Sequence, residues 1–206
     1  MRLSATVVAV FGIASLPLLA DTIPYPNIGM IAQTNTFTAS STGIIMGYFA
    51  GADAGDTDFI QMCDDTTNVC SGWTFNNHAT ALGASVNFGS VTAGDTLEFQ
   101  LKDSRTNLVY SSNPTNSADG INHAYTTNYS DTGHPALAPS IPAGMFVGME
   151  DLSSGVSDLD YNDDTFVFTN VATTATPEPA TTAVLALGFA ALGIVSRRRL
   201  ARPSAK

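Results

Sequence analysis

Basic residues are scarce in the middle of this 206-residue chain. Only Lys102 and Arg105 lie between residues 21 and 176, whereas seventeen Asp and Glu lie in the same interval, for a net charge near −15. A surface of this sign repels phosphate groups, so we expect no nucleic-acid partner. Cations are the ligands that such a surface favours.

The motifs of common hydrolases are also missing. The chain has no Gly-x-Ser-x-Gly and no His-Glu-x-x-His, and its three histidines lack the short spacing typical of zinc ligands. We therefore expect a non-catalytic protein. Two alternatives stay open: a carbohydrate-binding module, and a polysaccharide-active enzyme whose paired carboxylates cannot be recognised from an acidic cluster alone.

The first twenty residues have the pattern of an export signal. A basic Arg2 precedes an apolar stretch from Leu3 to Leu19, and the small Ala20 suits cleavage by signal peptidase. We predict a helical signal peptide over residues 1–20, with signal peptidase as a partner. The alternative is a first transmembrane helix.

The last thirty residues combine a Pro-Glu-Pro triplet, an apolar run and an arginine cluster. The triplet and the cluster consist of Pro177, Glu178, Pro179, Arg197, Arg198 and Arg199. Because prolines break a helix, a new element begins after the triplet, and residues 180–196 would span about 25 Å as a transmembrane helix. The positive-inside rule leaves the basic tail, residues 197–206, in the cytoplasm and the preceding domain outside.

This three-part order resembles the PEP-CTERM sorting signal of Gram-negative bacteria, over about residues 177–202. The resemblance implies that an exosortase-type enzyme recognises the tail and removes it. It also implies an exported protein of the cell envelope, cell surface or extracellular space, whose tail lies in the inner membrane before processing. A permanent tail anchor is the alternative.

Between the two signals, residues 21–176 contain short runs of β-branched and aromatic residues bounded by turn residues. The runs are 43–50, 85–88, 96–101, 108–110, 145–149 and 165–171. In the run 96–101, Leu97, Phe99 and Leu101 share one face, whereas Glu98 and Gln100 share the other, the pattern of a half-buried antiparallel strand. Seven to nine strands without helical periodicity predict an all-β domain, an antiparallel β-sandwich of jelly-roll type.

Cysteine is limited to Cys63 and Cys70. Two nearby thiols in an exported protein meet an oxidising compartment, so we predict a disulfide that closes a hairpin tip. A ring of this size contributes about 2 to 3 kcal/mol.

An acidic loop precedes the last apolar run. Its six carboxylates and one carboxamide are Glu150, Asp151, Asp158, Asp160, Asn162, Asp163 and Asp164. Such a cluster repels itself, and calcium takes six to eight oxygen ligands, so we predict a calcium site. The spacing is not that of an EF-hand. The alternative is a solvated loop that binds nothing.

The register of the strand after this loop sharpens the prediction. Phe166 and Phe168 should face the core, and the same period of two directs Asp164 inward. Burying several unpaired charges costs too much free energy. Two arrangements avoid this cost: the chain leaves the strand before Asp164, or a cation neutralises the acids at the edge of the sandwich. We expect both together.

The block from Glu150 to Leu152, the block from Ser157 to Asp164 and the aromatic strand that follows also resemble the end of a domain of unknown function. That domain occurs in bacterial secreted proteins, many of which carry the same sorting tail, and the similarity extends over about residues 44–171. The resemblance implies an extracellular β-sandwich with calcium binding and no assigned reaction.

A second and weaker candidate metal site lies in the Gly- and Asp-rich stretch from residue 51 to residue 58. Its ligands would be Asp53, Asp56 and Asp58. A turn between two strands explains the same composition without any ligand.

Overall fold

The computed structural model describes residues 27–130 and 141–175. The predicted signal peptide, the Pro-Glu-Pro triplet, the transmembrane helix and the basic tail lie outside these residues. Within the described part, no helix is long and apolar enough to cross a membrane. The helical element there is a single 3-10 turn, η1 (Pro114–Asn116).

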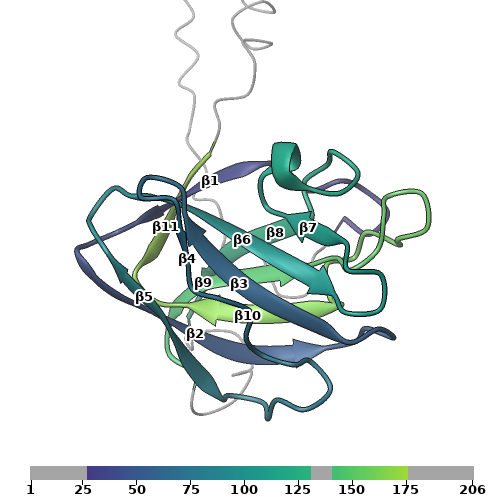
Figure 1. Ribbon diagram of the computed structural model, residues 1–206, viewed down its shortest axis with the longest axis horizontal. Coiled ribbons are helices and arrows are strands. Elements are labelled where there is room, and N and C mark those ends of the chain that lie inside the picture. Colours follow the sequence, from purple (N-terminus) through teal and green to yellow (C-terminus); the bar gives the residue numbers. More distant parts are fainter. Residues whose placement is uncertain (1–26, 131–140, 176–206) are drawn as a thin grey trace, which may run out of the picture.

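Eleven strands of the described residues form two antiparallel sheets (Figure 1). The strands are β1 (Asn35–Ala39), β2 (Gly43–Ala52), β3 (Asp58–Asp64), β4 (Val69–Cys70), β5 (Ser85–Val91), β6 (Thr96–Asp103), β7 (Val109–Ser111), β8 (Ala124–Tyr129), β9 (Gly144–Met149), β10 (Asp164–Phe168) and β11 (Val171–Ala175). The first sheet has the order β11-β1-β6-β3-β4, with β7 also paired to β6. The second sheet has the order β5-β2-β10-β9-β8.

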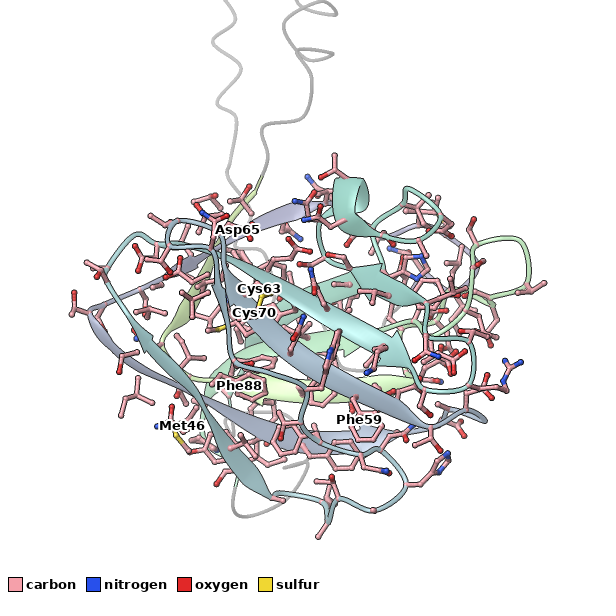
Figure 2. The ribbon with its side chains drawn as sticks, in the orientation of Figure 1. Met46, Phe59, Cys63, Asp65, Cys70 and Phe88 are labelled. Atoms are coloured by element: carbon pink, nitrogen blue, oxygen red, sulfur yellow. A yellow bond between two sulfur atoms is a disulfide. The ribbon has the colours of Figure 1, made fainter. Side chains whose placement is uncertain are left out.

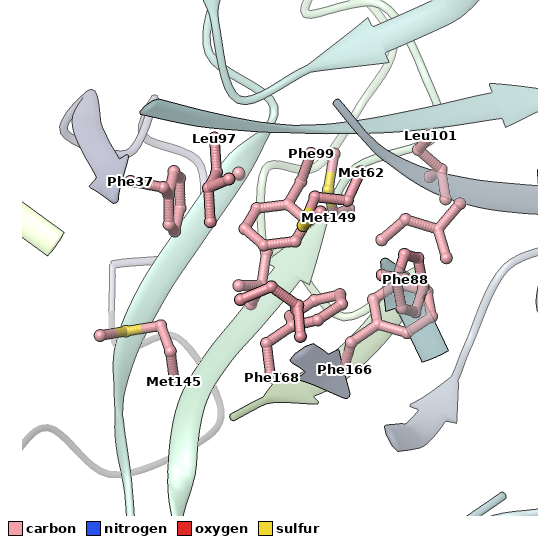
Figure 3. Packing of buried hydrophobic residues seen from close by; sticks show 14 of the residues in the cluster. Phe37, Met62, Phe88, Leu97, Phe99, Leu101, Met145, Met149, Phe166 and Phe168 are labelled. Atoms are coloured by element: carbon pink, nitrogen blue, oxygen red, sulfur yellow. The ribbon is translucent and has the colours of Figure 1, made fainter. Parts of the chain in front are cut away.

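The two sheets face each other across a core of apolar side chains (Figure 3). The ring centroids of Phe99 on β6 and Phe168 on β10 lie 4.2 Å apart, so the sheets are in direct contact. Phe166 and Phe168 are both fully buried, as their register predicts. The shared core makes the domain a β-sandwich. Its jelly-roll connectivity stays a prediction.

A second apolar cluster covers the outer face of the β5-β2-β10-β9-β8 sheet. Its buried members are Ala32, Ala50, Tyr125, Tyr129, Ile141, Phe146, Leu159, Tyr161 and Val167. Because Phe146 and Val167 alternate along their strands with residues of the first core, they face away from it. Leu159 and Tyr161 belong to the acidic loop, which is therefore packed onto the sheet.

The last predicted strand is divided in two. The chain leaves β10 after Phe168, turns at Asn170, which has a φ of 63°, and returns as β11. Asn170 tolerates this left-handed conformation, and its side-chain oxygen accepts a hydrogen bond from the Ser41 amide at 2.8 Å. The predicted run 165–171 continues through Asn170, so the sequence does not indicate this turn. Strands β1, β3, β4 and β8 and most of β11 lie outside the predicted runs. In β1, β8 and β11, Thr and Asn dilute the apolar residues.

Glu98 lies on a covered face, contrary to the half-exposed face that its alternation predicts. Its side chain is 1% exposed, because it contacts side chains from η1 and from β7, the strand that pairs with the next residues of β6. The carboxylate accepts hydrogen bonds from Ser111 Oγ at 2.5 Å, Asn116 Nδ2 at 2.6 Å and Gln100 Nε2 at 2.7 Å. Three donors therefore compensate the burial of this charge.

The predicted disulfide is confirmed. Cys63 on β3 is bonded to Cys70 on β4, and the two residues are cross-strand partners. Figure 2 labels Cys63 and Phe59 at opposite ends of β3, so the disulfide lies at the end of this strand that is remote from Asp58.

Candidate metal centre

Four carboxylates from three distant segments meet at the end of the sandwich where β3 begins. Asp58 is the first residue of β3, Asp164 is the first residue of β10, and Asp151 follows β9 closely. Asp163 directly precedes β10. We call Asp58, Asp151, Asp163 and Asp164 the carboxylate centre.

The carboxylates of the centre contact one another. Asp58 lies within hydrogen-bonding reach of both Asp151 and Asp164, and Asp151 lies within reach of Asp163. Two ionised carboxylates cannot donate to each other, so a proton or a cation must lie between such groups. The backbone amide of Asp151 also donates to Asp163 Oδ2 at 3.0 Å, which places these two side chains together.

Two oxygens of the centre are buried without a hydrogen-bond partner. They are Asp58 Oδ1 and Asp164 Oδ2, and the two residues are 0% and 1% exposed. A buried acceptor without a donor costs about 1–3 kcal/mol, and more when it is charged. A proton shared between the two carboxyl groups, or a bound cation, would satisfy these oxygens.

Asn77 orients Asp58. Its Nδ2 donates to Asp58 Oδ2 at 3.2 Å and to the carbonyl oxygen of Asp56 at 3.0 Å, while its Oδ1 accepts from the Asp58 amide at 3.1 Å. These bonds hold one carboxylate oxygen of Asp58 and leave the other directed to the centre. Local spacing does not predict this contact, because Asn77 lies nineteen residues from Asp58.

Burial and mutual repulsion oppose ionisation of the centre. Burial, together with the charges of Asp58 and Asp151, raises the pKa of Asp164 to about 9. Burial is also the first cause of the raised pKa values of Asp58 and Asp163, both about 7, and of Asp151, about 6. At neutral pH the centre therefore gains free energy from a bound proton or cation.

Neither base of the domain compensates the centre. The guanidinium of Arg105 binds Asp56 through Nε at 2.8 Å and Nη2 at 2.5 Å, and lies 3.8 Å from Asp103 Oδ2. This contact lowers the pKa of Asp56. Lys102 lies over the ring of Trp73, with Nζ 4.9 Å from its centroid. In the part of the chain that the structure describes, no ion pair joins a base to the centre.

The acidic loop is fixed by Glu150, which is fully buried. Its carboxylate accepts hydrogen bonds from the Tyr161 amide and from Ser157 Oγ. Leu159 and Tyr161 have φ values of 53° and 59°, which are strained for residues with a side chain. The Tyr161 hydroxyl accepts from the Ala32 amide at 2.7 Å, so the N-terminal segment also holds the loop in place.

Gly148 lets the loop approach β9. A Cβ atom at this position would lie 2.3 Å from the carbonyl oxygen of Tyr161, which is backbone and cannot move aside alone. The sequence does not predict this role of Gly148, because a glycine inside a strand does not identify the backbone that will pack on it.

Replacing Gly148 with Ala should move the loop and destabilise the domain by about 1–3 kcal/mol, the usual cost of overpacking. Calcium affinity should fall as well, because Asp163 follows Tyr161 closely. The matched control is Gly155→Ala in the same loop, where a Cβ meets nothing within 4 Å. Urea unfolding measures the stability of both variants. Equal unfolding midpoints would show that the close approach of the loop to β9 does not affect stability.

Three other acids of the loop form an outer group beside the centre. One oxygen each of Glu150, Asp158 and Asp160 lies within 4.8 Å of the other two. Asn162 donates from Nδ2 to Asp160 Oδ2 at 2.6 Å and thereby turns its amide towards this group. Among the described residues, this is the set of three acids whose oxygens are close enough together to share one ion, whereas the carboxylates of the centre contact one another in pairs. Both oxygens of Glu150 also accept hydrogen bonds.

A hollow of about 480 Å³ opens over the centre. Its lining comprises Asp53, Gly55, Asp56, Asp151, Leu152, Val156, Ser157, Asp158 and Asp163. Asp151 and Asp163 belong to both the hollow and the centre, so the hollow opens to that side of the centre, whereas Asp58 and Asp164 do not line it. The remaining acids of the lining keep the hollow electronegative.

The seven predicted ligands of the acidic loop are thus divided between two adjacent places. Asp151, Asp163 and Asp164 belong to the centre, whereas the other four form or adjoin the outer group. The three acids of the second candidate do not share one position. Asp58 completes the centre, Asp56 pairs with Arg105, and Asp53 lines the hollow.

The expectation that the chain leaves the strand before Asp164 is wrong. Asp164 is part of β10 and pairs with Ala52 on β2 and Met149 on β9. The period of two holds as far as this residue, so its side chain does point inward. Neutralisation of the buried acid is the explanation that remains.

Comparison with known proteins concerns the C-terminal end. The family model of the PEP-CTERM protein-sorting motif matches residues 175–199, and no curated protein matches the chain. The motif implies an exported protein that an exosortase-type enzyme processes, with a membrane-anchoring tail before processing. The chain therefore carries a PEP-CTERM sorting signal, as the order of its triplet, apolar run and arginine cluster predicts.

Proposed function

We propose that the chain is a non-catalytic protein of the cell surface or extracellular matrix whose β-sandwich is stabilised by calcium at the carboxylate centre. One observation carries the proposal: the side chains of Asp58 and Asp164 contact each other from opposite sheets, and one oxygen of each is buried without a hydrogen-bond donor. A cation removes both the repulsion and the unsatisfied acceptors.

Calcium suits the donors of the centre. All four side chains offer carboxylate oxygens, which hard cations prefer, and the hollow leaves room for water to complete six to eight ligands. Magnesium demands a near-ideal octahedron and retains its water more strongly.

Calcium titration followed by calorimetry tests the site. We expect the wild-type protein to bind calcium, and Asp151→Asn with Asp163→Asn to abolish binding. The matched pair is Asp158→Asn with Asp160→Asn, which removes the same charge from the outer group and should weaken binding less. A wild-type protein that binds no calcium at millimolar concentration would refute the site.

Mass spectrometry of the surface-exposed protein tests the processing. We expect the mature protein to lack the peptide from Arg197 to Lys206, because the sorting signal implies removal of the tail. Recovery of that peptide on the surface-exposed protein would establish a retained anchor instead.

A further inference from the structure

The carboxylate centre joins both sheets of the sandwich. Asp58 begins β3 in one sheet, and Asp164 begins β10, the middle strand of the other sheet. Asp151 adds the end of β9. An ion bound here connects segments that are about a hundred residues apart in the chain. The complete set of ligands therefore exists only in the folded domain.

An ion that binds only the folded state contributes its binding free energy to folding. The stabilisation is about 2.7 kcal/mol when free calcium is a hundred times the Kd, and it grows with concentration. Structural zinc sites of small domains behave in this way, and those domains are unfolded without the metal.

The cost of folding without an ion is large. Asp58 and Asp164 are almost completely buried, and each has a free oxygen. Leaving such a group charged and uncompensated, or keeping a proton on it at neutral pH, costs a large part of the small net stability of a domain. The two bases of the domain are occupied by Asp56 and Trp73. The calcium-free centre thus consumes much of the stability that the core supplies.

From these observations we infer that calcium binding at the carboxylate centre is the step that folds the domain, so that the chain stays unfolded inside the cell and folds after export. The inference rests on the proposed function. An exported chain that passes through the membrane unfolded gains from this arrangement, because free calcium is low in the cytoplasm and extracellular calcium modules bind at about 10⁻⁴–10⁻³ M.

The test uses the full chain in mild detergent at mildly alkaline pH, with chelator, with calcium or with an equal concentration of magnesium. Protease resistance and the fluorescence of Trp73, the only tryptophan, report folding. Equilibrium dialysis with calcium reports binding separately. We expect an unfolded, protease-sensitive chain with chelator and with magnesium, and a folded, resistant chain with calcium.

The separate readings distinguish the inference from the proposed function. A chelated chain that is as resistant as the calcium-bound chain overturns the inference, whether or not dialysis detects calcium binding. A chain that binds no calcium overturns the proposed function and the inference together.

A neutralised variant checks the cause. Asp58→Asn keeps the shape of the side chain and removes a charge from the centre, so we expect a larger resistant fraction with chelator than in the wild type. Asp65→Asn removes an exposed charge beyond the other end of β3 and should leave the calcium requirement intact. If both variants require calcium as the wild type does, repulsion at the centre is not the cause. The comparison of wild-type chain with and without calcium decides the inference even if Asp58→Asn fails to fold.

Discussion

Replacing Asp164 with Asn should stabilise the calcium-free protein and remove most of the stabilisation that calcium provides. In chelator at neutral pH, we expect the free energy of unfolding to rise by about 2–4 kcal/mol, because the wild type must keep a proton on a buried carboxyl whose pKa is about 9 and Asn needs none. In millimolar calcium, the variant should be less stable than the wild type, because the ion loses a charged ligand. The change of sign distinguishes a metal ligand from a residue that only packs.

Urea unfolding of wild type, Asp164→Asn and Asp65→Asn, each with chelator and with calcium, measures this effect. The control, Asp65→Asn, removes one exposed carboxylate. It should change the free energy of unfolding by no more than about 0.5 kcal/mol, both in chelator and in calcium. If Asp164→Asn lowers the free energy of unfolding equally with and without calcium, Asp164 contributes to packing and is not a calcium ligand.

Without calcium, the stability of the domain should fall as pH rises from 5 to 9. Four carboxylates of the centre have raised folded-state pKa values, from about 6 for Asp151 to about 9 for Asp164. Above the ordinary Asp value of 3.8, the folded state therefore holds more protons than the unfolded state. Protonation stabilises the fold fully below that value, and the contribution is lost as pH rises through the folded-state values.

Each additional proton held by the folded state lowers the free energy of unfolding by about 1.4 kcal/mol per pH unit. The groups around the centre act in the same direction. Asp56 and Asp103 repel Asp58, whereas the guanidinium of Arg105 is occupied by Asp56. Calcium should reverse the trend, because it binds the ionised carboxylates and competes with protons.

Thermal unfolding at a series of pH values, with chelator and with saturating calcium, measures both profiles. We expect melting temperature to decrease with pH in chelator and to hold or increase in calcium. Parallel profiles under the two conditions would contradict a shared site for protons and calcium.

Local patterns account for the features that the sequence predicts well. A period of two marks β6 and β10, and it places Phe166, Phe168 and Asp164 on one face before any contact is known. The disulfide follows from two cysteines seven residues apart in an exported chain. The sorting signal is itself a linear pattern, which is why the motif model matches it over residues 175–199.

Contacts across the fold account for what the sequence does not predict. Asp58 reads as part of a Gly- and Asp-rich loop, and only the packing of the two sheets brings it against Asp164. The alternation in β6 predicts a half-exposed Glu98. The side chain is buried because Ser111 on β7 and Asn116 on η1, both from a later segment, contact it. Gly148 and Asn77 act on partners thirteen and nineteen residues away, on which local spacing gives no information.

The sequence by itself therefore determines the strand class, the disulfide, the sorting tail and the inward register of Asp164, since each depends on neighbouring residues or on a short periodicity. Only the tertiary structure decides which acids share a position. It brings together Asp58, Asp151, Asp163 and Asp164 and separates Asp158 and Asp160 from them. The physical reason is that a period along one strand fixes which face a side chain occupies, whereas the packing of two sheets fixes what it meets there.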